Sequence, residues 1–139
     1  MSIEFEPIGI FYTDAGDIPR HWSVSDVTGR IVIDEMYTNG LKDIQSGQKI
    51  IVLFHFHKSS KFNPQKLVQT PPHRQQAMGV FSICSPFRPN PIGLSVLEVI
   101  DIDKNIISVR RADMIDGTPI LDIKPHIEDK HDCPSYAND

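Results

Sequence analysis

The stretch SPFRPNP, residues 85–91, places a cation and an amide among stiffening residues. Its three prolines fix their own φ angles and disfavour helix in the residues before them: Pro86, Pro89 and Pro91. Arg88 and Asn90 lie between these prolines, so their polar heads are held at defined angles at low entropic cost. Such preorganised groups suggest a binding or catalytic site, although many Pro-rich corners only turn the chain.

A second polar constellation follows in the stretch DMIDGTP, residues 113–119. Asp113 and Asp116 are two carboxylates three positions apart, Gly117 permits close approach of the backbone, and Thr118 adds a hydroxyl. By itself DGTP is a good turn in which the threonine can hydrogen-bond locally.

Other chemistry is poorly supported by the spacing of candidate residues. His55 and His57 lie on the same face of a predicted strand, but no acidic or cysteine ligand follows at a metal-binding spacing, so we predict no metal. Cys84 has no general base placed beside it by a motif and is expected to be a small buried or rim residue. No glycine-rich phosphate loop is present. Three phenylalanines are spaced like core residues: Phe54, Phe56 and Phe81.

Short β-like segments must position these residues. Runs of β-branched and aromatic residues bounded by turn formers predict strands over residues 4–12, 30–37, 49–57, 79–83, 92–103, 106–113 and 119–123. The most hydrophobic of them, 49–57, is expected to be buried on both faces near its start. Residues 41–46 predict a helix of one to two turns, and residues 58–76 a long loop. We therefore predict an all-β fold, a small single-domain β-barrel of about six or seven strands with one short helix and a long loop.

Length and composition place the chain among soluble globular proteins. Its 139 residues suit one domain, predicted as a barrel over 1–126 with a polar tail over 127–139. The longest apolar run, 50–54, is too short to span a bilayer, and the acidic N-terminus does not resemble a signal peptide. We expect a cytoplasmic protein with Cys84 and Cys133 reduced.

Charge argues only mildly against nucleic-acid binding. The net charge is −4, with acids gathered near the C-terminus. Several basic residues are concentrated in one stretch, which is either a solvated loop or a binding patch: Lys58, Lys61, Lys66, His73 and Arg74.

The two polar stretches, read as SPFRPNPIGLS and DMIDGTPILDIKPH, resemble signature blocks of the TsaA-like or TrmO family of S-adenosylmethionine-dependent tRNA methyltransferases. Residues 8–10, 19–21, 51–57 and 78–95 also look like family blocks, so the resemblance covers nearly the whole chain. It implies a small β-barrel that forms a homodimer and binds S-adenosylmethionine near the subunit interface.

Carried over by motif, the resemblance implies a set of cofactor-binding residues: Pro19, Arg20, His21, His57, Lys58, Cys84, Leu94, Asp116, Gly117 and Thr118. The family has an arginine where this chain has Cys84, so either Lys58 or Arg74 replaces that cation or cofactor binding is altered. For catalysis we hypothesise that Asn90, or a backbone carbonyl of the corner, accepts a hydrogen bond from the adenine amine, and that Arg88 positions phosphate or orders the corner.

The implied activity is methyl transfer from S-adenosylmethionine to the exocyclic amine of an anticodon-adjacent adenosine in tRNA, which carries a threonylcarbamoyl group in the family's substrate. The reaction is an in-line displacement that proximity and alignment can accelerate without a covalent intermediate. Two alternatives stay open: a non-catalytic β-barrel that binds S-adenosylmethionine or RNA, and methyl transfer to a small molecule. The acidic net charge and the loss of two family arginines, where this chain has Cys84 and Thr70, favour the first alternative.

Overall fold

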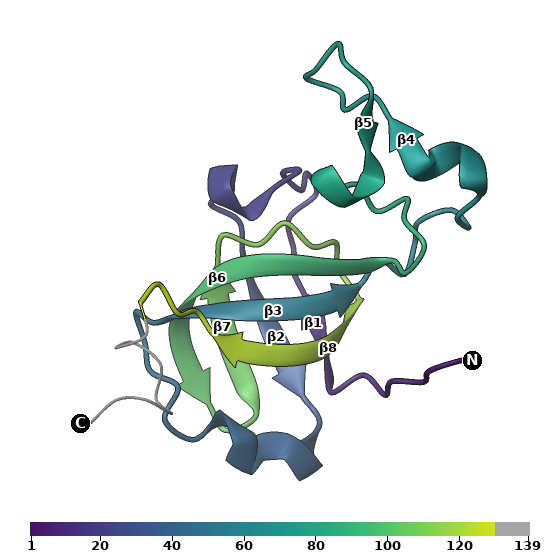
Figure 1. Ribbon diagram of the computed structural model, residues 1–139. Coiled ribbons are helices and arrows are strands. Elements are labelled where there is room, and N and C mark those ends of the chain that lie inside the picture. Colours follow the sequence, from purple (N-terminus) through teal and green to yellow (C-terminus); the bar gives the residue numbers. More distant parts are fainter. Residues whose placement is uncertain (130–139) are drawn as a thin grey trace.

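Six antiparallel strands close into a barrel in the computed structural model, which describes residues 1–129 (Figure 1). Around the barrel the order is β1-β2-β7-β6-β3-β8, so every strand is paired on both sides and no edge is left open. The strands are β1 (Gly9–Tyr12), β2 (Thr28–Ile33), β3 (Lys49–His55), β6 (Ile92–Asp103), β7 (Ile106–Arg110) and β8 (Thr118–Pro125). The predicted all-β barrel is confirmed.

The barrel core forms because apolar residues alternate along the strands. In β3, Ile50, Val52 and Phe54 are buried, whereas Ile51 and Leu53 between them are only half-buried. Alternate side chains of a strand point to opposite faces, so one set fills the barrel and the other faces outward. The expectation that this segment is buried on both faces is therefore wrong. The same alternation in the other strands supplies further core residues: Phe11, Ile31, Ile33, Leu97, Val99, Ile107, Val109 and Ile120.

Helical structure within residues 1–129 is limited to short 3-10 segments: η1 (Trp22–Val24), η2 (Glu35–Leu41), η3 (Pro64–Leu67) and η4 (Val80–Ser82). The helix predicted over 41–46 is wrong in position, because the helical segment η2 ends at Leu41. η2 also occupies the end of the strand predicted over 30–37, so that strand ends at Ile33. Leu41 is buried and Ile44 packs against the core from a turn, which explains their three-residue spacing. Asp43 between them has φ +76°, which interrupts a helix. No helix in this described part of the chain is long and apolar enough to cross a membrane.

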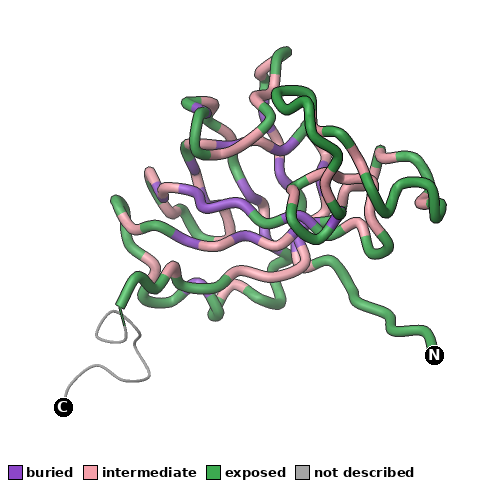
Figure 2. The backbone as a smooth tube through the Cα atoms, turned by 45° about the horizontal axis from the view of Figure 1, so that its top comes forward, coloured by how far each residue is buried: buried purple, intermediate pink, exposed green. Residues whose placement is uncertain are grey.

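The long loop and the residues after it form an arm, defined here as residues 58–79. It contains η3 and two short strands, β4 (Val68–Gln69) and β5 (Met78–Gly79), which pair with each other rather than with the barrel. In Figure 1 this pair projects away from the barrel, and in Figure 2 much of the chain outside the barrel is exposed. The strand predicted over 79–83 is wrong, because the chain turns into η4 there.

Only one apolar residue of η4 enters the core. Val80 is 1% exposed, whereas Phe81 is 78% exposed. The prediction of Phe81 as a core residue is therefore wrong, while Phe54 is buried and Phe56 packs against the core.

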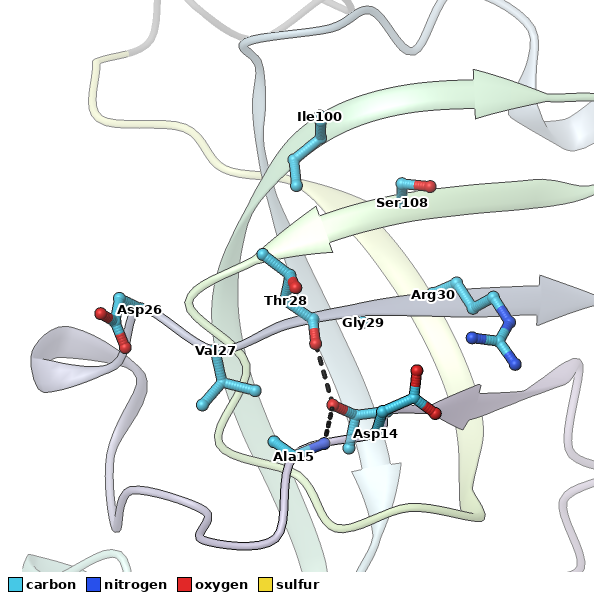
Figure 3. Close-up of a pocket in the computed structure, with 10 residues that line it drawn as sticks. Asp14, Ala15, Asp26, Val27, Thr28, Gly29, Arg30, Ile100 and Ser108 are labelled. Atoms are coloured by element: carbon cyan, nitrogen blue, oxygen red, sulfur yellow. Dashed lines mark hydrogen bonds between the residues drawn. The ribbon is translucent and has the colours of Figure 1, made fainter.

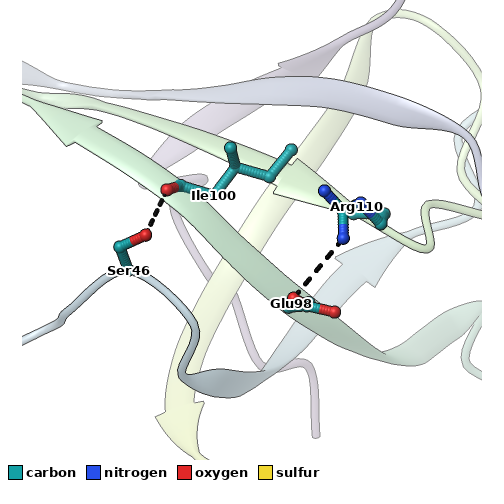
Figure 4. Close-up of polar contacts among 4 residues, drawn as sticks. All are labelled: Ser46, Glu98, Ile100 and Arg110. Atoms are coloured by element: carbon teal, nitrogen blue, oxygen red, sulfur yellow. Dashed lines mark hydrogen bonds and ion pairs between the residues drawn. The ribbon is translucent and has the colours of Figure 1, made fainter.

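The end of the barrel where β3 begins is closed by a loop bound to β6. A bulge shifts the β6–β7 register between Val99 and Asp101. The hydroxyl of Ser46 donates to the carbonyl of Ile100 at 2.5 Å, and Glu98 faces Arg110 at 3.5 Å across the ladder (Figure 4). These contacts fasten that end, and the predicted site residues His57 and Lys58 follow the other end of β3. The predicted tail over 127–139 and Cys133 fall largely outside the described residues.

Candidate functional site

The proline corner is held together by its own arginine. Nη1 of Arg88 donates to the carbonyls of Ile83 at 3.0 Å and Ser85 at 3.1 Å. The amide of Phe87 donates to the hydroxyl of Ser85 at 3.1 Å. Hydrogen bonds from a charged donor are stronger than neutral ones, so the guanidinium orders the backbone that carries Asn90.

The corner leaves the Asn90 side chain available. The backbone carbonyl of Asn90 accepts from the amide of Ile92 at 2.7 Å, and that of Pro91 accepts from the amide of Phe56 at 2.9 Å. The carbonyl of Phe87 accepts from Nε2 of Gln69 at 2.7 Å. By contrast, the Asn90 side chain is exposed and makes no hydrogen bond with the rest of residues 1–129. The carboxamide is therefore an acceptor that can turn to a ligand, whereas the backbone carbonyls of Asn90 and Pro91 are already bonded.

The DGTP turn is shaped by the side chains of its first and third residues. Oδ1 of Asp116 accepts from the amide of Thr13 at 3.0 Å. The hydroxyl of Thr118 donates to the carbonyl of Ile115 at 2.7 Å, and Thr118 is only 2% exposed. Both polar groups thus bind the protein backbone. Gly117 between them, at φ +85°, donates its amide to the carbonyl of Phe11 at 2.8 Å and has one side-chain neighbour within 4 Å of its Cβ position.

That neighbour is His57. A Cβ built on Gly117 would lie 3.9 Å from Nε2 of His57, so the turn approaches the imidazole closely. His57 comes just after β3, whereas Gly117 comes just before β8, and these two strands are paired. The structure therefore brings together two of the stretches that the sequence singled out separately.

The His57 imidazole has a buried nitrogen without a partner. Among residues 1–129, its Nδ1 is the one buried side-chain nitrogen or oxygen that makes no hydrogen bond. Burial, followed by the nearby Lys58 and His55, lowers the pKa of His57 below the ordinary 6.5. An uncharged ring with an unpaired buried nitrogen costs free energy unless a ligand supplies the partner.

A polar cluster beneath the η1 loop was only partly recognised from sequence. The Asp113 carboxylate accepts from the Ser95 hydroxyl, and it lies near the backbone of Trp22 and the His21 ring. Ser95 is fully buried on β6. Sequence reasoning noted Asp113 but missed Ser95, whose signal is a hydroxyl in an otherwise apolar stretch, IGLSVL. Asp113 thereby links the His21 loop to β6.

Burial raises the pKa of the Asp113 carboxyl above its ordinary 3.8, and the hydrogen bond from Ser95 partly opposes this. The folded protein therefore binds this proton more tightly than the unfolded chain, so stability falls as pH rises from 3.8 through the raised pKa. We predict that Asp113→Asn removes this loss. The free energy of unfolding of the variant, relative to wild type, should increase between about pH 4 and about pH 7 in urea titrations.

The matched control is Asp17→Asn, which removes an exposed carboxylate. Its stability profile should run parallel to that of wild type. A parallel profile for Asp113→Asn as well would contradict a buried, proton-binding role for Asp113.

The remaining residues implied by the resemblance lie at the surface. Arg20, Lys58 and Cys84 are exposed, and Leu94 on β6 is 51% exposed. Cys84 was expected to be either buried or at a rim. Its thiol is exposed, so the buried position is wrong. His21 accepts the amide of Ser23 on Nδ1 at 3.2 Å, and the half-buried Pro19 precedes this loop. The charge of Lys58 acts on His57, so this cation lies near the imidazole.

Neither a metal cluster nor the hollow over the β2 side of the barrel coincides with these residues. Within residues 1–129, no group of three or more His, Cys, Asp or Glu side chains is placed to hold a metal ion. An open hollow of about 580 Å³ lies over β1, β2 and β7 and is lined by Asp14, Asp26, Arg30 and Ser108 among others (Figure 3). None of the predicted site residues lines it.

Comparisons with known proteins agree on one family. The family profile described as tRNA-methyltransferase O N-terminal domain matches residues 8–133. An S-adenosyl-L-methionine-binding protein of Archaeoglobus fulgidus is 39% identical over 124 residues, which cover 87% of this chain and 87% of that protein. The tRNA (adenine(37)-N6)-methyltransferase of Escherichia coli is 31% identical over 151 residues, covering 98% of this chain and 64% of the enzyme.

A solved structure gives the same result. The crystal structure of TrmO from Pseudomonas aeruginosa superposes with a TM-score of 0.72 at 26% identity, covering 91% of this chain and 57% of that one. The chain thus spans less than two thirds of the length of both the E. coli enzyme and the solved protein.

Proposed function

The chain belongs to the family of the tRNA-methyltransferase O N-terminal domain, also called TsaA-like or TrmO, and from this premise we propose that it is an S-adenosylmethionine-dependent tRNA methyltransferase. Its substrate is the exocyclic amine of the adenosine beside the anticodon, bearing the threonylcarbamoyl group. Relatives named as tRNA (adenine(37)-N6)-methyltransferases in E. coli and in mouse support this reaction over a non-catalytic barrel or a small-molecule methyltransferase.

The observation that carries the proposal is the His57 imidazole, whose Nδ1 is buried and unpaired and whose Nε2 faces Gly117 of the DGTP turn. A ligand with hydrogen-bonding atoms would satisfy this nitrogen, and Gly117 offers no side chain to block its approach. The lowered pKa keeps the imidazole neutral, which avoids repulsion with the positive sulfonium and ammonium of S-adenosylmethionine. The residues present therefore fit this cofactor.

The other contacts follow from residue chemistry. We assign the carboxylate of the cofactor to Lys58 and Arg20, both exposed cations near the candidate site. Lys58 thereby replaces the family arginine that is Cys84 here, because its charge already reaches His57. Leu94 offers apolar surface to the adenine, His21 and Pro19 are assigned to the cofactor by their motif, and Asp116 and Thr118 hold Gly117 in place.

Catalysis in this proposal depends on alignment. The bound cofactor supplies an electrophilic methyl group. Asn90 accepts a hydrogen bond from the adenine amine and so orients the nitrogen lone pair toward that methyl group. Arg88 is a positioning residue, since its hydrogen bonds to Ile83 and Ser85 fix the corner on which Asn90 stands.

We further propose that the protein works as a cytoplasmic homodimer. Large apolar side chains are exposed next to the candidate site, where a second copy would cover them: Phe81 at 78%, Leu94 at 51% and Ile92 at 42% exposure. The predicted cofactor residues lie at the surface rather than in the large hollow, which agrees with a pocket completed between two subunits.

Calorimetric titration with S-adenosylmethionine tests the cofactor assignment. We predict binding by the wild type and about tenfold weaker binding by His57→Phe, which removes the hydrogen bond at Nδ1 but keeps a planar ring. The stability of this variant should be unchanged or higher, because an unpaired buried polar atom is lost.

His55→Phe is the matched control, since His55 is exposed and only two residues away. Its affinity should equal that of the wild type. Absence of binding to the wild type would contradict the cofactor assignment, and equal affinities in all three proteins would contradict the role of His57.

A further inference from the structure

Charge is divided unevenly along this chain. Residues 44–97 contain six Lys or Arg and no Asp or Glu, whereas the rest contains eight Lys or Arg and all eighteen acids. A net charge of −4 therefore combines a segment of +6 with a remainder of −10, counting His as neutral. Solvated surfaces usually mix the two signs, so a segment that carries only positive charge is a candidate for binding anions.

Four of the six Lys or Arg side chains of this segment lie on the arm, which also carries one histidine: Lys58, Lys61, Lys66, Arg74 and His73. All five are exposed. The three ion pairs found within residues 1–129 involve other basic groups, Arg110, Lys124 and His126. The fold therefore does not neutralise the positive charge of the arm, which remains available to a partner.

The arm is braced against the proline corner. Nε2 of Gln69 donates to the carbonyl of Phe87 at 2.7 Å, and Nζ of Lys66 lies 5.3 Å from the centre of the Phe87 ring. At the tip, the amide of Arg74 donates to the carbonyl of Pro71 at 3.0 Å and closes the turn. A partner held by the arm would consequently be held in register with the corner that carries Asn90.

We propose that the arm binds the phosphate backbone of the substrate tRNA, with Lys61 and Arg74 contacting phosphates of the anticodon stem so that the loop reaches the proline corner. This inference rests on the proposed function and adds which part of the chain recognises RNA. Phosphate contacts position a nucleic acid without reading its sequence, and the acidic remainder repels RNA from the other faces. The small barrel thereby obtains one productive orientation despite its negative net charge.

The test measures the affinity for a fluorescent anticodon stem-loop RNA by anisotropy over a series of salt concentrations. We compare wild type with Lys61→Gln/Arg74→Gln, which leaves Lys58 and the braced Lys66 intact. Affinity at about 0.1 M salt should fall at least about tenfold, and the slope of log affinity against log salt should decrease in magnitude by about 1.4 to 2. Affinity for S-adenosylmethionine should not change.

The control removes equal charge elsewhere, with Lys42→Gln/Lys49→Gln. Lys49 begins β3 and the arm follows its far end, roughly 20 Å away at the rise of a strand, and Lys42 lies in the loop before it. Control binding should stay within about twofold of wild type. Equal losses in both variants, or none in the arm variant, would overturn the proposal. So would a change in the oligomeric state of the arm variant by sedimentation, which would assign the arm to contacts between copies.

Failure of this inference is separable from failure of the proposed function. If the arm variant methylates tRNA with the KM of the wild type, the arm is not the RNA-binding element although the protein is a methyltransferase. If the wild type binds RNA through the arm but transfers no methyl group, the arm assignment stands and the proposed activity is wrong.

Discussion

Replacement of Asn90 by alanine should lower kcat for tRNA methylation by about a hundredfold or more, with little change in the affinity for S-adenosylmethionine. Losing one preorganised hydrogen-bonding group aimed at the reacting centre typically has an effect of this size. The carbonyls of Asn90 and Pro91 are already bonded to Ile92 and Phe56, so they are poorly placed to take over from the lost side chain. The measurement is single-turnover methyl transfer to a tRNA transcript at saturating cofactor.

Asn39→Ala provides the control for this substitution. Asn39 is exposed on η2, and its side chain makes no hydrogen bond within residues 1–129. Its kcat should match that of the wild type. An Asn90→Ala enzyme with unchanged kcat would eliminate the carboxamide as the acceptor of the amine hydrogen bond.

Replacement of Gly93 by alanine should lower the free energy of unfolding by about 1 to 3 kcal/mol, the usual cost of an extra methyl group in a packed core. A Cβ on Gly93 would lie 2.3 Å from Cζ and 2.5 Å from Cε2 of Phe54. Phe54 is 4% exposed and packs edge-on against Phe56, with 5.0 Å between the centres of the two rings. The Phe54 ring therefore has little room to move away. Chemical denaturation measures the change.

Gly79→Ala is the matched substitution on the arm. A Cβ there meets nothing within 4 Å, and the backbone has φ −63°, which any residue adopts. Its stability should equal or slightly exceed that of the wild type. Equal stabilities for the two alanine variants would show that Gly93 is not required for the packing of Phe54.

The strands were predictable where burial on one face is continuous. The run over 92–103 coincides with β6, in which alternating residues from Gly93 to Val99 are buried. The run over 79–83 contains equally apolar residues, but only Val80 is buried and Phe81 faces outward. Local sequence does not distinguish an apolar residue that the fold buries from one that it leaves exposed. The predicted strand over 79–83 was wrong for this reason.

The candidate site was predictable as a set of residues but not as a set of contacts. Motifs singled out the proline corner and the DGTP turn, yet the bond of Asp116 to Thr13 joins residues 103 positions apart. The burial of Ser95 beneath Asp113 and the missing partner of His57 also depend on how the closed barrel brings its loops together. These relations appear only once the strand order is known.

The most direct test incubates the purified chain with S-adenosylmethionine and tRNA carrying the threonylcarbamoylated adenosine, and then analyses the tRNA nucleosides by mass spectrometry. The account predicts one added methyl group on the exocyclic nitrogen of that adenosine with the wild type, and little or none with Asn90→Ala. Cofactor bound by the wild type without any methyl group on the tRNA would contradict it, and would leave the chain as a binding protein of this family.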